Sequence, residues 1–265
     1  MARKVSKSNK SAVSKDAAVK PAVASLRLAG KRAVLTGGSR GIGFAIAKAF
    51  VVEGGSVLIT GRDSAVLRTA RQELASVAAA GAEVFAESCD VRDEKAVAAV
   101  FTKVKKRWGR LDILVNNAGI SQKNVDVVDT PLELWRSVID TNLTGMFLVA
   151  RAAVPLMERG ATIVNTLSLT VKGTVPKFAA YNASKMGALA LTDNLRAELV
   201  SAGIRVTALI PGATDTEIWE QFWPDAPRKD MVHAADVAVG VLYAVTLPPQ
   251  ASVNELLVVP QKGLL

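Results

Sequence analysis

Cysteine and histidine are nearly absent from this sequence, which contains one of each among its 265 residues. The single cysteine, Cys89, excludes an internal disulfide and a cysteine-rich zinc site. The single histidine, His233, excludes a histidine-based metal cluster and a serine–histidine relay. We therefore expect no bound metal, and we expect Cys89 to be a packed thiol rather than a nucleophile. His233 is expected to precede a helix at residues 234–245.

Long apolar runs are missing as well. No run approaches the roughly 18 uninterrupted apolar residues of a membrane-spanning helix, and the N-terminal residues lack the apolar core of a secretory signal. These absences predict a cytoplasmic protein without membrane association. Apolar residues nevertheless make up 50% of the chain, which is long enough to bury the core of one large domain.

The net charge of +9 is concentrated near the N-terminus. Residues 1–30 hold seven of the 33 Lys and Arg residues and one acidic residue, which leaves a net charge of only +3 for the rest. Residues 1–25 lack apolar periodicity and are rich in Lys, Ser and Ala, which is typical of a flexible tail. We interpret this tail as a solubilising extension. A polyanion-binding arm and an organelle-targeting segment are the alternatives, and nucleic acid is expected as a partner only through a weak contact of this tail.

From residue 26 onward, short aliphatic runs alternate with Ala-rich segments of helical character. Runs this continuous in apolar residues are typical of strands buried on both faces, and helical crossovers make such a sheet parallel. The sequence therefore predicts one α/β domain over residues 26–265, a doubly wound Rossmann fold with an approximately seven-stranded parallel sheet and helices on both faces. The predicted strands are 33–37, 56–60, 82–90, 112–119, 161–168, 204–212 and 255–259.

A glycine-rich segment, TGGSRGIG at residues 36–43, follows the first predicted strand and precedes a helix-like stretch. Gly37, Gly41 and Gly43 allow a tight turn, close backbone approach to a pyrophosphate and close packing of helix on strand. Ligands of doubly wound folds bind at the carboxyl ends of the strands, and a helix N-terminus favours negative charge. The segment therefore predicts a dinucleotide site, with a purely structural turn as the alternative.

Tyr181 and Lys185 are four residues apart in a segment of small residues, so they share one face of a helix. Taken alone, this pair is also compatible with ordinary helix packing. A free tyrosine has a pKa of about 10, and a nearby cation favours its phenolate. We therefore expect Lys185, together with the positive ring of an oxidised nicotinamide in the dinucleotide site, to move the pKa of Tyr181 towards a useful range. Tyr181 would then exchange a proton with a substrate oxygen. Ser168, at the end of a predicted strand, would hydrogen-bond the same oxygen.

The order and spacing of these segments resemble those of the short-chain dehydrogenase/reductase family. The resemblance covers about residues 26–260, and Ser168 lies thirteen residues before Tyr181, as the catalytic serine of the family does. The motifs that carry the resemblance are TGxxxGxG at 36–43, NNAG at 116–119, NLTG at 142–145, YxxxK at 181–185 and PGATDT at 211–216.

The resemblance implies an oxidoreductase that interconverts a small-molecule carbonyl and a secondary alcohol, working as a homotetramer or homodimer. It also implies that Lys185 holds the nicotinamide ribose, that Asn142 supports a water relay to Lys185, and that Asp90 binds the adenine amino group. A dinucleotide-binding sensor or scaffold without turnover is the alternative. The implied catalytic residues are Ser168, Tyr181, Lys185 and Asn142. The implied cofactor-binding residues are Thr36, Gly37, Ser39, Arg40, Gly41, Ile42, Gly43, Arg62, Asp90, Val91, Asn117, Ala118, Gly119, Tyr181, Lys185, Pro211, Gly212, Thr214 and Thr216.

The residues at the end of the second predicted strand indicate which nicotinamide cofactor is bound. An acidic residue there accepts the ribose hydroxyls of NAD(H), whereas a basic residue pairs with the 2′-phosphate of NADP(H). Gly61 stands where NAD-preferring relatives carry an aspartate, Arg62 follows it, and Arg40 offers a second guanidinium. The sequence predicts NADP(H). Asp63 leaves NAD(H), as in an NAD-dependent alcohol dehydrogenase, as the less favoured alternative.

Residues 214–230 contain Trp219, Phe222 and Trp223 among acidic residues. The resemblance implies a mobile substrate lid in this position, with the aromatic side chains lining an apolar pocket. A subunit contact is the alternative use of these aromatics. Leu167 departs from the pattern of the family because many members carry a serine there, and the ending NELLVVPQKG lacks the usual pair of glycines.

Overall fold

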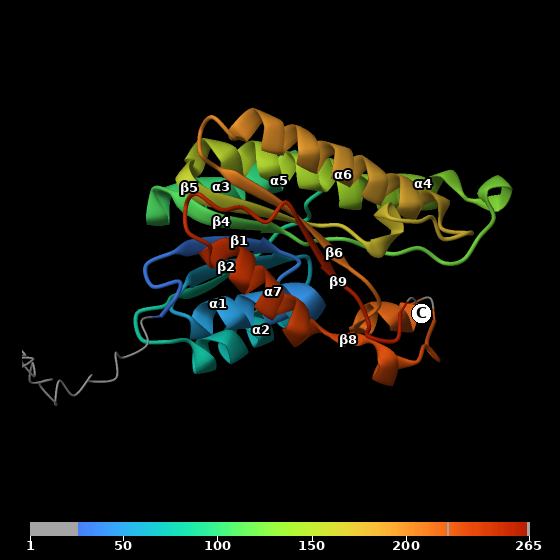
Figure 1. Ribbon diagram of the computed structural model, residues 1–265, viewed down its shortest axis with the longest axis horizontal. Coiled ribbons are helices and arrows are strands. Elements are labelled where there is room, and N and C mark those ends of the chain that lie inside the picture. Colours follow the sequence, from blue (N-terminus) through green and yellow to red (C-terminus); the bar gives the residue numbers. More distant parts are fainter. Residues whose placement is uncertain (1–25, 222, 264–265) are drawn as a thin grey trace, which may run out of the picture.

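The computed structural model of the chain describes residues 26–221 and 223–263. It consists of a central sheet between two layers of helices (Figure 1). The tail at residues 1–25 and Phe222 lie outside the described residues. The strands of the central sheet are β1 (Arg32–Thr36), β2 (Ser56–Gly61), β3 (Val84–Ser88), β4 (Leu111–Asn116), β5 (Met157–Thr166), β6 (Arg205–Pro211) and β9 (Glu255–Val258).

The seven strands are all parallel, in the order β3-β2-β1-β4-β5-β6-β9. This order confirms the predicted doubly wound sheet. The chain builds outward from β1 to β3 and then crosses back to β4, which pairs with β1 with Ala33 opposite Ile113. Ligands of open α/β sheets bind where the strand order reverses, outside the carboxyl ends of the strands. The reversal point between β1 and β4 is therefore the expected position of the site.

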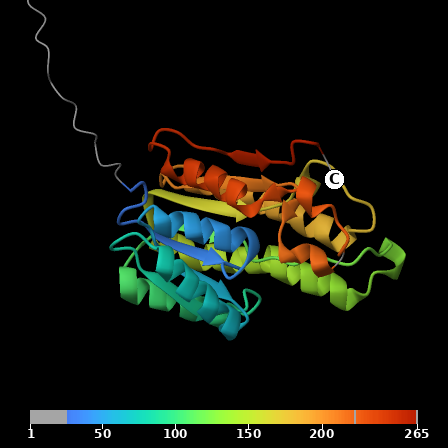
Figure 2. The same ribbon diagram turned by 90° about the horizontal axis from the view of Figure 1, so that it is seen from below.

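Helices cover both faces of the sheet. The two faces bury separate apolar clusters, one containing Leu35 and Phe50 and the other containing Phe101 and Leu114. Among the described residues, no helix combines the length and apolar character needed to cross a membrane. One layer is formed by α1 (Gly41–Val52), α2 (Ser64–Val77) and α7 (Ala234–Thr246); the other contains α3 (Glu94–Trp108), α4 (Leu132–Ile139), α5 (Gly145–Ala153) and α6 (Ala179–Leu199) (Figures 1 and 2).

Local hydrogen bonds set the helix boundaries. The carboxylate of Asp63 begins α2 by accepting the N–H groups of Ala65 at 2.8 Å and Val66 at 3.1 Å, and Asp93 begins α3 in the same way. By contrast, α1 has no side-chain cap and no acidic residue in its first turn. Since the first N–H groups of a helix have no partner within the helix, those of α1 are available to a ligand in the adjoining loop.

Several details differ from the sequence prediction. The predicted strands at 112–119 and 161–168 end earlier, at Asn116 and Thr166, so most of the NNAG motif and Ser168 lie in the loops that follow. A short parallel pair, β7 (Thr214–Asp215) and β8 (Val232–His233), joins the two ends of segment 214–230. Residues Asp140–Thr144 form a π-helical turn between α4 and α5. The end of β4 and the β7–β8 pair depend on partners distant in sequence, which apolar periodicity does not encode.

Candidate active site

The carboxyl ends of the central strands open into one cleft of about 1380 Å³. Pockets for a single ligand usually measure about 300–1000 Å³, so this cleft has room for a dinucleotide and a second molecule. Of the predicted cofactor-binding residues, Thr36 and Gly43 lie behind the cleft wall. The others line the cleft: Gly37, Ser39, Arg40, Gly41, Ile42, Arg62, Asp90, Val91, Asn117, Ala118, Gly119, Tyr181, Lys185, Pro211, Gly212, Thr214 and Thr216.

Thr36 and Asn117 join the ends of β1 and β4. The Thr36 hydroxyl oxygen accepts the N–H groups of Asn117 and Ala118, each at 3.0 Å. The Asn117 side-chain amide donates to the carbonyl oxygens of Thr36 and Gly37, each at 3.2 Å. Thr36 therefore acts by holding the glycine-rich loop beside the NNAG loop at the reversal point of the sheet.

The glycine-rich loop leaves little space for side chains. A Cβ atom on Gly37 would lie 3.0 Å from the Cα of Ala118, and one on Gly43 would lie 2.3 Å from the carbonyl oxygen of Gly37. Gly37 and Gly41 also adopt positive φ angles of 63° and 55°, which favour glycine. Bare backbone at the uncapped N-terminus of α1 fits a pyrophosphate, so the loop can hold the predicted dinucleotide.

Two arginines lie at the end of the cleft next to β2. Arg40 and Arg62 are exposed, and neither forms an ion pair within the described part of the chain. Asp63 is committed to capping α2: the amides of Val66 and Ala65 lower the pKa of this carboxyl, with a smaller contribution from Arg40. A Cβ atom on Gly61 would approach the Ser39 hydroxyl to 3.2 Å, so the glycine keeps this corner open.

Asp90 lies in the same part of the cleft and binds the Arg92 guanidinium at 2.6 Å. This hydrogen bond is the main reason that the pKa of Asp90 is lowered. The carboxylate therefore stays ionised and remains an acceptor for a ligand N–H, while Arg92 fixes its orientation. The buried Cys89 beside it has a pKa raised to about 11, chiefly by burial, so it is a packed thiol. His233 immediately precedes α7, as predicted.

Ser168, Tyr181 and Lys185 come together where β5 ends and α6 begins. The Ser168 side chain forms a hydrogen bond with that of Tyr181. The Lys185 amino nitrogen lies 5.6 Å from the centre of the Tyr181 ring and donates to the carbonyl oxygen of Thr166 at 3.0 Å. Lys185 is buried, with 5% exposure, whereas Tyr181 is half-buried and faces the cleft.

Burial controls the pKa values of this pair. It raises the pKa of Tyr181 above 10.0 despite a smaller opposing contribution from the hydrogen bond with Ser168. It also lowers the pKa of Lys185 from 10.5 to about 8. In the chain alone, the pKa of Tyr181 is not lowered towards the phenolate, because loss of hydration disfavours the charged form of both groups. The contribution expected from an oxidised nicotinamide ring stays a prediction.

Asn142 is fully buried in the π-helical turn. Its side-chain oxygen accepts the N–H of Ile120 at 2.8 Å, and its side-chain nitrogen donates to the Ile120 carbonyl at 2.9 Å and to the Ser184 hydroxyl at 3.0 Å. A Cβ atom on Gly119 would lie 3.2 Å from the Asn142 oxygen and 3.7 Å from the Lys185 nitrogen. Asn142 thus connects the NNAG loop to α6 and lies close to Lys185.

Gln122 also belongs to the site, although the sequence analysis did not identify it. Its side chain is 3% exposed; its oxygen accepts the N–H of Tyr181 at 2.8 Å, and its nitrogen donates to the carbonyl oxygen of Lys177 at 3.0 Å. The residue before α6, Phe178, provides no side-chain cap. Gln122 therefore caps the catalytic helix from a loop 59 residues earlier, and no local motif signals such a partner.

The cleft continues past Tyr181 between the loop at 169–178 and segment 214–230. Trp219 and Trp223 both line this end and pack edge to face, with ring centres 6.0 Å apart and planes at 63°. The Trp219 indole N–H donates to the Thr214 carbonyl at 2.8 Å. Two of the three predicted aromatic residues therefore form a pocket wall, and the third, Phe222, lies outside the described residues.

The sequence profile described as short chain dehydrogenase matches residues 31–227. The chain belongs to the short-chain dehydrogenase family. A similar member is sulfoacetaldehyde reductase 2 of Chromohalobacter salexigens, which is 36% identical over 240 residues, or 86% of this chain and 94% of that protein. The chain is therefore an oxidoreductase of this family.

Solved structures of the family superimpose on nearly the whole domain. An alcohol dehydrogenase from the archaeon Thermococcus sibiricus, complexed with 5-hydroxy-NADP, has a TM-score of 0.81 at 29% identity, covering 88% of this chain and 97% of that chain. A short-chain dehydrogenase from Burkholderia cenocepacia in complex with NADP has a TM-score of 0.79 at 32% identity, with the same coverage. These similarities confirm the fold expected from the sequence.

Proposed function

We propose that the chain is an NADP(H)-dependent oxidoreductase that interconverts a carbonyl compound and a secondary alcohol. The observation that carries this proposal is the meeting of Ser168, Tyr181 and Lys185 on the cleft wall, beside a glycine-rich loop that fits a pyrophosphate. When bound, the nicotinamide cofactor supplies or accepts a hydride. The side chains of the protein supply the proton and orient the reacting oxygen.

Tyr181 is the proposed general acid and base. Because burial keeps its pKa high, the phenol is protonated at neutral pH and can donate its proton to a carbonyl oxygen. In the opposite direction it accepts the proton of the alcohol. Ser168 hydrogen-bonds the same substrate oxygen and stabilises the charge that develops on it. Lys185 binds the nicotinamide ribose hydroxyls, and Asn142 holds the peptide of Ile120 beside this lysine.

The preference for NADP(H) is supported by the corner of the cleft next to β2. Arg40 and Arg62 offer two guanidinium groups that are without ion pairs among the described residues, and guanidinium groups suit a phosphate. Asp63, the acidic candidate for the ribose of NAD(H), uses its carboxylate to cap α2. Two of the similar solved structures contain NADP or a derivative of it.

A substrate screen tests this function. The purified chain is incubated with ketones, aldehydes and secondary alcohols in the presence of NADP(H) or NAD(H), and nicotinamide absorbance is followed. The panel includes a sulfonated aldehyde because one relative is a sulfoacetaldehyde reductase. We expect NADPH oxidation with at least one carbonyl compound. Binding of NADPH without turnover of any compound would instead indicate a sensor or scaffold.

Replacement of the two tyrosines provides a matched comparison. Tyr181→Phe removes the proposed proton donor and should lower kcat by about 10²- to 10⁴-fold. Tyr243→Phe alters the other tyrosine of the sequence, which is 59% exposed on α7, and should leave kcat unchanged. Equal turnover by wild type and Tyr181→Phe would contradict the proposed mechanism.

A further inference from the structure

The cleft beyond Tyr181 has an apolar wall built from three separate parts of the chain. Val175 and Phe178 come from the loop before α6, Trp219 and Trp223 from segment 214–230, and Pro260 from the residues after β9. Val175 and Trp223 each remain 43% exposed. Large apolar side chains that stay accessible within a concave site are typical of ligand contacts.

The aromatic surface begins at the proposed proton donor. Phe178 packs edge to face against Tyr181, with ring centres 6.3 Å apart and planes at 80°. The rings of Trp219 and Trp223 pack together in the same manner on segment 214–230. A substrate oxygen bound by Tyr181 is therefore close to an aromatic wall on the side of Phe178.

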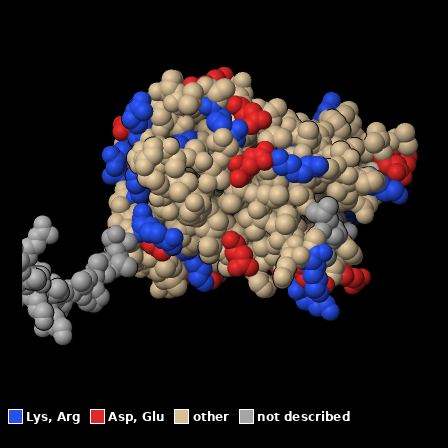
Figure 3. Space-filling view, viewed as in Figure 1, with Lys and Arg blue, Asp and Glu red and all other residues tan. Residues whose placement is uncertain are grey.

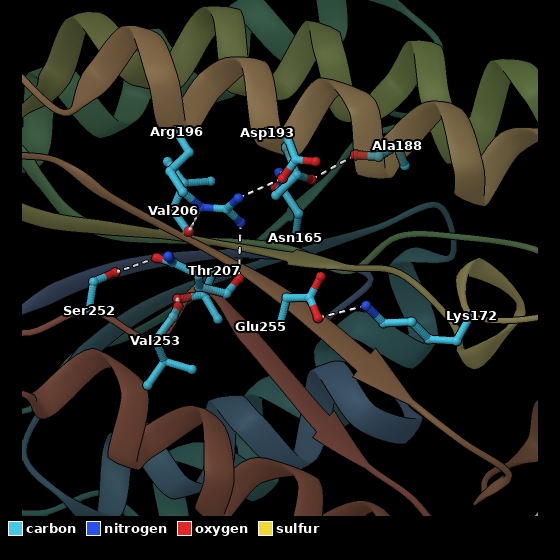
Figure 4. Close-up of polar contacts among 12 residues, drawn as sticks. Asn165, Lys172, Ala188, Asp193, Arg196, Val206, Thr207, Ser252, Val253 and Glu255 are labelled. Atoms are coloured by element: carbon cyan, nitrogen blue, oxygen red, sulfur yellow. Dashed lines mark hydrogen bonds and ion pairs between the residues drawn. The ribbon is translucent and has the colours of Figure 1, made fainter.

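Charged groups at this end of the cleft do not favour an anion. Lys172 donates to Glu255 at 2.7 Å (Figure 4), and the Lys177 amino group lies 3.6 Å from the carboxylate of Asp126. Both lysines thus already have acidic partners. Glu217 also lines this end, and no basic side chain within the described ranges forms an ion pair with it. An anionic substrate would meet two lysines that already have carboxylate partners and one repelling carboxylate.

We propose that the substrate is an uncharged carbonyl compound that carries an aromatic or similarly bulky apolar group, such as an aryl ketone, together with the corresponding secondary alcohol. This inference rests on the proposed function and specifies its substrate class. Burial of an aromatic group against Trp223 and Val175 contributes favourable binding free energy. A carboxylate on the same ring loses hydration without gaining a cation.

The reaction balances with the cofactor already proposed. In the reducing direction, the carbonyl carbon accepts a hydride from the reduced nicotinamide, and the π electrons of the C=O bond move to the oxygen. That oxygen takes the proton of Tyr181. The ketone is reduced to the alcohol, the nicotinamide is oxidised, and Tyr181 later recovers a proton from solvent.

Three ketones test the substrate class. Acetophenone carries a neutral ring, 4-acetylbenzoate carries the same ring with a carboxylate, and acetone has no ring. With NADPH, we expect kcat/KM for acetophenone to exceed that for each of the other two by about 10- to 100-fold. Equal or higher kcat/KM for 4-acetylbenzoate or acetone would overturn the inference and leave the proposed function intact. Failure of every carbonyl in the wider screen would contradict the function itself.

Binding without turnover provides a second measurement. In the presence of NADPH, the alcohol product 1-phenylethanol cannot react, so calorimetric titration measures its affinity directly. The matched probe is 4-(1-hydroxyethyl)benzoate, which differs only in its carboxylate. We expect binding of 1-phenylethanol to be at least about tenfold tighter. Equal affinities, or tighter binding of the carboxylated alcohol, would contradict the inference.

Variants of Trp223 locate the contact. Trp223→Ala should lower kcat/KM for acetophenone by about tenfold and that for acetone much less, since only the ring loses a contact. Trp223→Phe keeps an aromatic side chain and should restore most of the preference for acetophenone over acetone. This result would show that Trp223→Ala loses a ring contact rather than misfolding the segment. Trp135→Ala, a change on α4 at a 38% exposed tryptophan outside the cleft, should preserve the preference. An unchanged preference in Trp223→Ala would argue against the proposed wall.

Discussion

Lys185 is an amino group held in an almost completely buried position, with the carbonyl oxygen of Thr166 as a hydrogen-bond acceptor at 3.0 Å. Burial lowers its pKa from 10.5 to about 8, so the folded chain loses the lysine proton at a lower pH than the unfolded chain. Below pH 8 the native state therefore carries the cost of a buried charge. Buried ionisable groups with strongly shifted pKa values are typical of functional sites, even though they lower the stability of the folded chain.

The pH dependence of unfolding measures this cost. Between pH 8 and 10.5 the unfolded chain holds a proton that the native chain has lost, so the contribution of Lys185 to stability rises with pH. Compared with Lys185→Met, the wild type without nucleotide should gain about 1–3 kcal/mol of unfolding free energy between pH 7 and 9.5. Chemical denaturation at several pH values provides the measurement. A control substitution at Lys48, which is half-exposed, should show no such trend, and a difference independent of pH for Lys185→Met would contradict the lowered pKa.

Arg40 and Arg62 allow a test of cofactor choice at the residue scale. The double substitution Arg40→Ala and Arg62→Ala removes both guanidinium groups from the corner beside Gly61. A hydrogen bond to a charged group contributes about 1.5–3 kcal/mol, so the KM for NADPH should rise by about 10- to 100-fold. The KM for NADH should change little, because NADH lacks the 2′-phosphate. A parallel rise for both cofactors would indicate general damage to the site rather than loss of a phosphate contact.

At the scale of elements, the catalytic helix α6 depends on the loop after β4. Gln122 holds the N–H of Tyr181 and the carbonyl of Lys177, and Asn142 holds Ile120 and Ser184. Proton-transferring and cofactor-binding segments are thereby fixed to each other by side-chain amides. Gln122 is a positioning residue, since its contacts are to backbone groups of the helix and the preceding loop.

Substitution of Gln122 should separate positioning from binding. Gln122→Met keeps the approximate shape but leaves the N–H of Tyr181 without its side-chain acceptor, which costs about 1–3 kcal/mol, whereas the Lys177 carbonyl still accepts the N–H of Val125. We expect kcat to fall by about tenfold while the KM for NADPH stays within about twofold, because the glycine-rich loop is untouched. Gln122→Glu retains an acceptor for Tyr181 and should recover part of kcat. Gln72→Met, on the exposed face of α2, is the matched control and should behave as wild type. Proportional changes in kcat and the KM for NADPH would contradict a positioning role.

The elements were largely predictable because the strands in the middle of the sheet contain nearly continuous apolar runs, which are typical of burial on both faces. The Tyr181 and Lys185 pair and the glycine-rich loop were predictable because their spacing is local. The residue at which β4 ends was not predictable, since the N–H groups of Asn117 and Ala118 donate to the Thr36 side chain instead of to a strand partner. Gln122 was not predictable either, because its partners lie more than 50 residues away.

At the scale of the whole molecule, much of the net positive charge lies in residues 1–25, outside the proposed site. The described surface seen in Figure 3 shows Lys and Arg groups interspersed with Asp and Glu. Residues 1–25 contribute six basic residues and one acidic residue to the total charge. None of the proposed site residues belongs to that segment. The predicted homo-oligomer and cytoplasmic location also belong to this scale, and size-exclusion chromatography and cell fractionation would test them.

Deletion of residues 1–25 tests whether the basic segment takes part in the reaction. Because every residue proposed to react or to hold the cofactor lies between 36 and 216, we expect kcat/KM and the KM for NADPH to remain within about twofold of the full chain. Any retention of the full chain on a DNA or heparin column should weaken after the deletion and with added salt. A large loss of turnover would show that the segment contributes to the site.

The pairing of β9 with β6 gives the site an order of assembly during synthesis. Chains are made from the N-terminus, so Ser168, Tyr181 and Lys185 leave the ribosome long before β9, which covers Leu209 and Ile210 at the edge of β6. Pro260, which follows β9, adds the last described part of the apolar wall. A growing chain of about 250 residues would thus already contain the proton-transferring groups and most of the proposed apolar wall, while still lacking β9 and Pro260.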